Sequence, residues 1–142
     1  MPIQHSDVLF YTGVATAESG REGRVSSDDG KLDVTVSQPK ELGGTGRGTN
    51  PEQLFAATYS ACFHASLAIV ADEEKVDITG SSVTARVSIG KNNDGFGIIA
   101  DLTASLPGLE PAVAQRLLDK AHAICPYSNM TRNGIEVSLK VG

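Results

Sequence analysis

The stretch from Thr49 to Phe63, which reads TNPEQLFAATYSACF, decides the fold of this chain. Its first residues are typical of a helix start, since Asn50 can cap the helix, Pro51 suits the first helical position and Gln53 completes a capping-box spacing. From Leu54 to Ala71 the residues are nearly all apolar or small. A helix that is apolar on every side is buried on every side, so we expect this segment to be the central helix of the domain.

Before this helix the chain alternates in the manner of strands. A short strand is predicted over residues 8–14, where Val8, Phe10, Thr12 and Val14 alternate with Leu9, Tyr11 and Gly13. Asp29-Gly30 is a tight-turn signal, and alternation over 31–36 then predicts a hairpin with one buried face. The glycine-rich loop over 39–49 lacks the lysine of a phosphate-binding loop, so we interpret it as a flexible approach to the helix.

After the helix, a second hairpin is predicted from alternation over 83–89 and 96–102, on either side of the turn at residues 93–95. A second helix is expected from about Glu110, with Pro126 as its stop, and a final strand over 135–141. Hairpins and helices are segregated along the chain, which favours an α+β fold. The length of 142 residues fits one domain, residues 1–142.

Composition excludes several classes of function. The net charge is −5 and no Lys/Arg cluster exists in the sequence, which argues against nucleic acid and anionic membrane as partners. The amino terminus has neither the basic start nor the apolar run of a secretory signal, and we expect no membrane span. A cytoplasmic location follows as an expectation, and thiols there stay reduced. The two cysteines are therefore catalytic, redox-active or inert core residues rather than a permanent disulfide.

Spacing alone does not decide between these roles. Cys62 lies midway along the apolar helix, on one face with Phe55, Tyr59, Ser66 and Ile69. Cys125 lies near the end of the second helix, on a face with Leu118 and Ala121. Neither belongs to a C-x-x-C motif, and free cysteine often behaves as a small core hydrophobe, so spacing by itself favours that interpretation.

A zinc site built from both cysteines, His64 and His122 is not expected. Cys62 and His64 point about 200° apart around a helix, so both cannot easily reach one ion. We expect His64 to face a pocket, a cleft or solvent, and His122 to be a partly buried imidazole with a backbone partner. On composition alone, Arg21, Arg24 and Glu52 are ordinary surface charges.

Two cysteine motifs nevertheless resemble a known family. Cys62 ends the stretch quoted above, and Cys125 lies in AHAICPYSN, residues 121–129. Together with GREG at 20–23 and ELGG at 41–44, they are similar to the organic hydroperoxide resistance proteins, the Ohr branch of the OsmC-like family. The Asn-Pro-Glu-Gln helix start resembles that branch more than OsmC itself. The resemblance implies an OsmC-like fold, with antiparallel sheets packed on two central helices in an intertwined homodimer.

The same resemblance implies a peroxidase. Cys62 would become a sulfenic acid, Cys125 would close a disulfide with it, and Arg21 and Glu52 would assist Cys62. Reduction by dihydrolipoyl groups, of dihydrolipoamide or of a lipoylated protein, is implied as well, with no cofactor. His64 departs from the family, which more usually has an aliphatic residue at this position.

The residue types suit this reaction. A thiolate breaks the peroxide bond, but burial in an apolar helix disfavours the thiolate, so Cys62 needs a cation, and Arg21 is the candidate. Glu52 would hold that guanidinium by a bidentate pair. A thiol at a helix carboxyl end, as expected for Cys125, is disfavoured as a thiolate and suits resolution. The apolar surroundings of Cys62, namely Phe55, Tyr59 and Phe63, favour an alkyl hydroperoxide over hydrogen peroxide.

Helix geometry adds one expectation of its own. Glu52 precedes Cys62 by ten residues, so the two lie about 15 Å apart along one helix. We therefore expect Arg21 and Glu52 to serve a cysteine of a second subunit, in an obligate homodimer with composite sites. The alternatives left open are an OsmC-subtype peroxidase, a non-catalytic binding domain for an apolar ligand, and a metal-binding protein.

Overall fold

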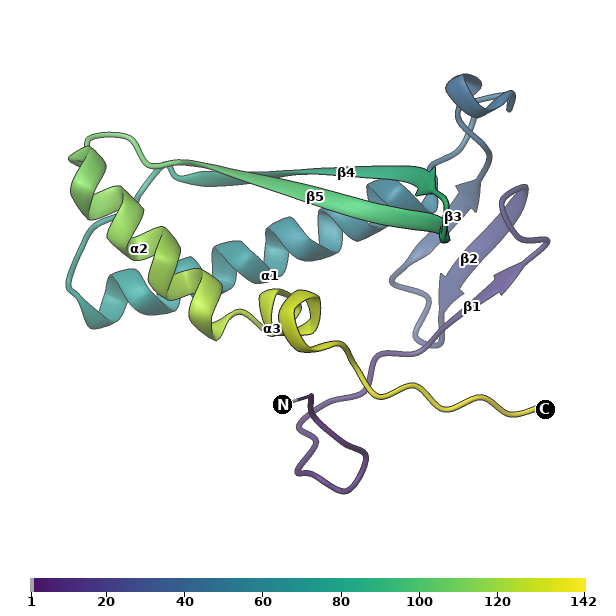
Figure 1. The fold of residues 1–142 in the computed structure, drawn as a ribbon, viewed down its shortest axis with the longest axis horizontal. Helices are drawn as coiled ribbons and strands as arrows, with labels where there is room; N and C mark the ends of the chain where they lie inside the picture. The colour runs from purple at the N-terminus through teal and green to yellow at the C-terminus, as the bar shows by residue number, and fades with distance from the viewer. Residues whose placement is uncertain (1) are drawn as a thin grey trace. The chain divides into compact units, whose positions relative to one another are not determined.

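The computed structural model describes residues 2–142 and has the α+β architecture that the sequence predicts (Figure 1). The chain divides into two compact units. One unit holds the segment up to Val8 together with Ala57–Arg86 and Ala100–Gly142, and the other holds Leu9–Ala56 and Val87–Ile99. Three of the boundaries, at residues 56/57, 86/87 and 99/100, fall inside a long helix or strand. The single domain over residues 1–142 stays a prediction.

The elements follow one another in the order strands, helix, strands, helices. In chain order they are β1 (Ala15–Glu18), β2 (Gly23–Ser27), β3 (Asp33–Val36), the 3-10 turn η1 (Lys40–Leu42), α1 (Pro51–Glu73), β4 (Ser82–Asn92), β5 (Gly95–Ser105), α2 (Pro111–Ile124) and α3 (Pro126–Asn133).

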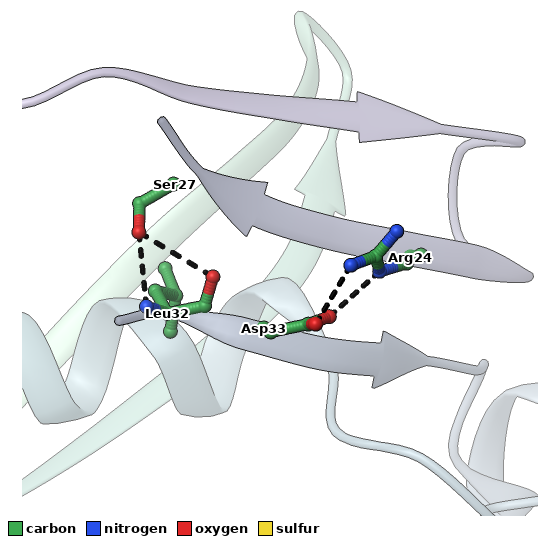
Figure 2. A network of polar contacts seen from close by, with 4 residues as sticks. All are labelled: Arg24, Ser27, Leu32 and Asp33. Atoms are coloured by element: carbon green, nitrogen blue, oxygen red, sulfur yellow. Dashed lines mark hydrogen bonds and ion pairs between the residues drawn. The ribbon is translucent and has the colours of Figure 1, made fainter. Parts of the chain in front are cut away.

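The first sheet is a three-stranded antiparallel meander, β1-β2-β3, in which Val25 of β2 lies between Ala17 and Val34. The predicted turn at Asp29-Gly30 connects β2 to β3. Figure 2 shows the side chains that fix it, with the Ser27 hydroxyl accepting from the Leu32 N–H at 2.9 Å.

The predicted strand over Val8–Val14 is wrong. The first strand is β1, and the preceding residues, Phe10 among them, are exposed and belong to no strand. Apolar residues can give a segment a buried face, but a strand also needs a neighbour along its length for its backbone groups, and the bond from the Asp28 N–H to the Val14 carbonyl, at 3.1 Å, lies only at the end of this segment.

Helix α1 begins as predicted. The Asn50 side-chain oxygen accepts from the Gln53 N–H at 2.8 Å and Pro51 is the first helical residue. The Gln53 side chain departs from the capping-box pattern, because its carbonyl oxygen accepts from the Thr49 hydroxyl at 2.8 Å.

The expectation that α1 is buried on every side is wrong for a single chain. Phe63, Leu67 and Val70 are buried, whereas Ile69 is 53% exposed. Ala65 and Ala68, which lie between them, are exposed too. By length and composition alone α1 is apolar enough to cross a bilayer, with a mean hydropathy of 1.6, but core helices pass the same test. Its buried side chains make it a core helix of this protein.

The second hairpin, β4-β5, is present as predicted. Helix α2 buries one face through Leu117 and Ala121, in line with Cys125, and Pro126 ends it as expected. Pro126 also begins α3, which the sequence analysis missed. Because proline lacks an N–H and has a helical φ, it suits the first position of a new helix as well as the end of an old one.

The predicted final strand over 135–141 is wrong for the same reason as the first. Residues 135–142 form an extended tail after α3, yellow in Figure 1, and Leu139 within it is 92% exposed. The tail carries a strand-like apolar face and has no neighbouring strand among residues 2–142.

Candidate active site around the two cysteines

The fold brings the two cysteines together. Both are free thiols, and their Sγ atoms lie 4.0 Å apart. Cys62 is half-buried in the middle of α1, and Cys125 is fully buried between α2 and α3. Spacing alone had favoured two unrelated core residues, but cysteines 63 positions apart in sequence are neighbours in space.

The α2–α3 elbow positions Cys125. Its N–H donates to the Ala121 carbonyl at 2.8 Å, which completes the last turn of α2. Its own carbonyl accepts from the Asn129 N–H at 2.9 Å, which opens the first turn of α3. Cys125 therefore caps both helices, and the following proline keeps its backbone extended.

This placement corrects the sequence-based argument about the helix dipole. Cys125 lies at the carboxyl end of α2 but also at the amino end of α3, where the dipole favours a negative charge. The two helix ends oppose each other at this residue. The dipole of α2 therefore does not by itself mark Cys125 as the resolving thiol.

The surroundings of Cys62 disfavour its thiolate. Burial raises the pKa of the Cys62 thiol, and the neighbouring Cys125 raises it further by charge repulsion and by its hydrogen bond. The backbone N–H of Tyr127, in the first turn of α3, interacts with Cys62 and lowers the pKa, but only in part. Activation at neutral pH therefore needs an additional positive group.

Arg21 and Glu52 form the bidentate pair that the sequence predicts. The two guanidinium nitrogens donate to the two carboxylate oxygens at 3.1 and 2.7 Å. The Glu52 side chain is only 13% exposed and that of Arg21 31%. The pair raises the pKa of Arg21 and holds that of Glu52 below its usual range, so both groups stay charged at neutral pH.

The turn between β1 and β2 presents Arg21. Ser19 and Gly20 both have positive φ, which reverses the chain within a few residues. At Gly23 a side chain would collide with the Glu18 carbonyl, so the close return of the backbone requires glycine. The GREG motif at residues 20–23 thus has a local structural reason, which is to hold Arg21 beside Glu52.

Arg24 has a different partner. It pairs with Asp33 across β2 and β3 at 2.6 and 2.7 Å, as Figure 2 shows, on an exposed face of the meander. The structure therefore separates two arginines that composition alone treats alike.

The three predicted pocket residues lie along α1 with different exposures. Phe55 is half-buried, whereas Tyr59 and Phe63 are buried. The Tyr59 ring lies 6.1 Å from the Tyr127 ring, and its hydroxyl is hydrogen-bonded to Ser128 at 2.8 Å. Sequence reasoning missed Tyr127 and Ser128, although both belong to the AHAICPYSN motif. A helix expected directly after Pro126 would have drawn attention to them.

The histidines have other partners than a metal ion. His64 is half-buried and bonds to Ser81 at 2.9 Å, in a hollow that Asp72 also lines. His122 is exposed, and its ring bonds to the Ser128 side chain, so the expectation of a partly buried imidazole with a backbone partner is wrong. Among residues 2–142 no three His, Cys, Asp or Glu side chains gather in a metal-binding group.

Known proteins are similar to this chain over most of its length. Residues 44–140 match the family model described as OsmC-like protein. An organic hydroperoxide resistance protein of Xanthomonas axonopodis pv. citri is 50% identical over 133 residues, 92% of this chain and 94% of the relative. The protein OhrB of Bacillus subtilis is 41% identical over 94% of this chain and 99% of its own.

Solved structures give the same result. A putative organic hydroperoxide resistance protein of Vibrio cholerae is 44% identical, with a TM-score of 0.83 over 94% of this chain and 92% of that one. An organic hydroperoxide resistance protein of Elizabethkingia anophelis is 49% identical, with a TM-score of 0.82 over 91% and 94%. This chain therefore belongs to the OsmC-like family and, within it, to the organic hydroperoxide resistance proteins.

Proposed function

We propose that this chain, a cysteine-based peroxidase of the organic hydroperoxide resistance family, reduces organic hydroperoxides to alcohols through Cys62 and Cys125. The observation that carries the proposal is the pair of free thiols 4.0 Å apart, one half-buried and one fully buried. A buried thiol beside a more accessible one suits a two-step reaction, in which the accessible sulfur meets the substrate first.

Each step balances. The Cys62 thiolate attacks one peroxide oxygen, so that an S–O bond forms, the O–O bond breaks and the alkoxide takes up a proton to leave as the alcohol. The Cys125 sulfur then bonds to the sulfenic sulfur, the S–O bond breaks and water leaves with the proton of the Cys125 thiol. A dithiol of the dihydrolipoyl class reduces the resulting disulfide and is itself oxidised to a disulfide.

Arg21 supplies the positive charge in this proposal and Glu52 fixes its orientation. Support comes from the bidentate pair and from the raised pKa of Cys62, which calls for a cation. A guanidinium offers several donors and can face a thiolate and a peroxide oxygen together. Arg24 is excluded from the role because Asp33 holds it elsewhere.

We further propose that the functional protein is an intertwined homodimer with composite sites. Helix α1 is continuous from Pro51 to Glu73, so Glu52 and Cys62 are separated by about 15 Å of helix within one chain. The apolar residues exposed in a single chain support a second copy as the cover, because the carboxyl-terminal tail, the segment before β1 and one face of α1 all carry exposed large apolar side chains.

The substrate is an alkyl or fatty acyl hydroperoxide, taken up against Phe55, Tyr59 and Phe63. We place the reaction in the cytoplasm, where a peroxidase with free thiols is kept reduced.

The substrate preference tests the proposed activity. Catalytic efficiency with an alkyl hydroperoxide and a dithiol reductant should exceed that with hydrogen peroxide by at least about tenfold, or about 1.4 kcal/mol of transition-state binding. Equal efficiencies would contradict the proposal that an apolar pocket selects the substrate. No turnover with either hydroperoxide would favour a binding domain for an apolar ligand.

The composite site is tested by mixing chains. Cys62→Ser and Glu52→Ala homodimers should both be impaired, whereas a heterodimer of the two would regain one intact site. Cys62→Ser mixed with Cys125→Ser is the matched control. Because both cysteines of a pair belong to one chain, this heterodimer has no intact site. Verified heterodimers that recover nothing, or a fully active monomer in sedimentation, would contradict the arrangement.

A further inference from the structure

A chain of three hydrogen-bonding side chains runs beside the cysteine pair. The Tyr59 hydroxyl and Ser128 Oγ lie 2.8 Å apart, and Ser128 Oγ and His122 Nδ1 also lie 2.8 Å apart. Tyr59 and Ser128 are buried, at 3% and 0% exposure, whereas His122 is exposed. One serine hydroxyl has one donor and two acceptor positions, so it can hold both neighbours at once.

The chain connects the elements that carry the two sulfurs. Tyr59 lies one helical turn before Cys62 on α1, and His122 lies one turn before Cys125 on α2. Ser128 lies in the first turn of α3, three residues after Cys125. The hydrogen bonds thus join α1 to the α2–α3 elbow, the two elements that carry the thiols.

A second contact closes the elbow. Arg132, at the end of α3, donates to the His122 carbonyl at 2.9 Å and to the Ala123 carbonyl at 3.4 Å. Both carbonyls belong to the last turn of α2, where the helix ends and offers them no N–H donor of its own. The elbow is therefore held by Arg132, and the Tyr59–Ser128 bond ties it to α1.

We propose that Ser128, with Tyr59 and His122, is a positioning group that sets the approach of Cys125 to Cys62 during disulfide closure. The inference rests on the proposed function. In closure the Cys125 sulfur bonds to the Cys62 sulfenic sulfur, the S–O bond breaks, and hydroxide leaves as water with the proton of the Cys125 thiol. The sulfurs start 4.0 Å apart and must reach about 2.05 Å, so a small displacement of the elbow changes the closure rate strongly.

The first test uses Ser128→Ala and follows Cys62 sulfenic acid by dimedone trapping after one equivalent of an alkyl hydroperoxide. Closure should slow by at least about three- to tenfold, the range expected for each lost hydrogen bond, because the bonds to Tyr59 and to His122 are both removed, while the first oxidation keeps its rate. The matched control is Thr131→Val, because the Thr131 hydroxyl lies on the same helix and donates to the Ser128 carbonyl, at 2.7 Å, and not to the Ser128 hydroxyl.

Two further variants keep the test decisive if Ser128→Ala folds poorly. Tyr59→Phe removes only the bond to α1 and should slow closure no more than Ser128→Ala does, and the double variant should add nothing to Ser128→Ala, since that change already breaks this bond. His122→Ala, at an exposed position, should slow closure less, and His122→Asn should restore it, because the amide can reach the serine in place of Nδ1.

A second readout does not depend on peroxide. The Cys62–Cys125 disulfide, formed with diamide, is equilibrated with a dithiol, and Ser128→Ala should shift the equilibrium about three- to tenfold towards the free thiols. If the wild type formed no sulfenic acid with hydroperoxide, the proposed function would fail and this equilibrium would still judge the positioning role. Closure and equilibrium at wild-type values in all three variants would overturn the inference.

Discussion

The middle of α1 and the α2–α3 elbow each present one cysteine, but in different ways. Cys62 belongs to one uninterrupted helix and is half-buried, whereas Cys125 caps two helices and is fully buried. The difference teaches that two cysteines in contact can have different backbone contexts, and the proposed mechanism assigns them different roles. In that mechanism the half-buried thiol on the helix meets the substrate, and the buried thiol at the elbow then closes the disulfide.

The largest effect should come from replacing each cysteine in turn by serine. Cys62→Ser should abolish hydroperoxide consumption, because no sulfur would then attack. Cys125→Ser should keep the first turnover and trap a sulfenic acid on Cys62, detected as a dimedone adduct. If Cys125→Ser consumed no hydroperoxide even once, the assignment of attacking and resolving residues would be reversed.

The next effect concerns the two arginines. Arg21→Ala should slow the first oxidation about a hundredfold, the usual cost of losing one preorganised electrostatic group, while Arg24→Ala should change it little. Stopped-flow oxidation of the reduced protein measures both. A larger loss for Arg24→Ala would show that the role falls on the other arginine.

A smaller effect concerns Glu52→Gln, which keeps the shape of the side chain but removes its charge. The first oxidation should slow about tenfold, because one charge-assisted pair no longer fixes Arg21. Asp33→Asn at the Arg24 pair is the matched control and should leave the rate unchanged.

The same variant has a pH signature. The folded pKa of Glu52 is lowered, so its contribution to stability is present above the ordinary glutamate pKa of about 4.3 and is lost as pH falls through the folded value. The stability difference between wild type and Glu52→Gln in denaturant titrations should therefore shrink below about pH 4. A difference that grew on acidification would contradict the charged pair.

The smallest effect concerns labelling of the wild type. Iodoacetamide should modify Cys62 before the fully buried Cys125. Because burial raises the pKa of Cys62, labelling of Arg21→Ala should keep rising with pH beyond the ordinary thiol value of about 8.5. Peptide mapping at several pH values checks both the order and the slope.

The sequence predicted most of the features in which nearby residues supply the hydrogen-bond partners of the backbone. The capped start of α1, the turn at Asp29-Gly30 and the end of α2 at Pro126 all depend on local chemistry, and all are confirmed. The strands expected over 8–14 and 135–141 are absent, because a strand needs a partner that alternation cannot supply.

The candidate site likewise has features that the sequence predicted and features that depend on tertiary contacts. The Arg21–Glu52 pair was predicted from the family motif, and its geometry is confirmed. The approach of Cys62 to Cys125 required the tertiary fold, since spacing alone favoured two separate core residues. The Tyr59–Ser128–His122 chain could not be predicted, because it depends on α3, a helix that begins at the proline interpreted only as a stop.

The most direct test of the central claim is the intact mass of the reduced protein after one equivalent of an alkyl hydroperoxide. We predict that the wild type loses two hydrogens as the Cys62–Cys125 disulfide forms, and that Cys125→Ser instead gains one oxygen on Cys62. A wild-type mass that does not change, with the hydroperoxide still present in solution, would contradict the account.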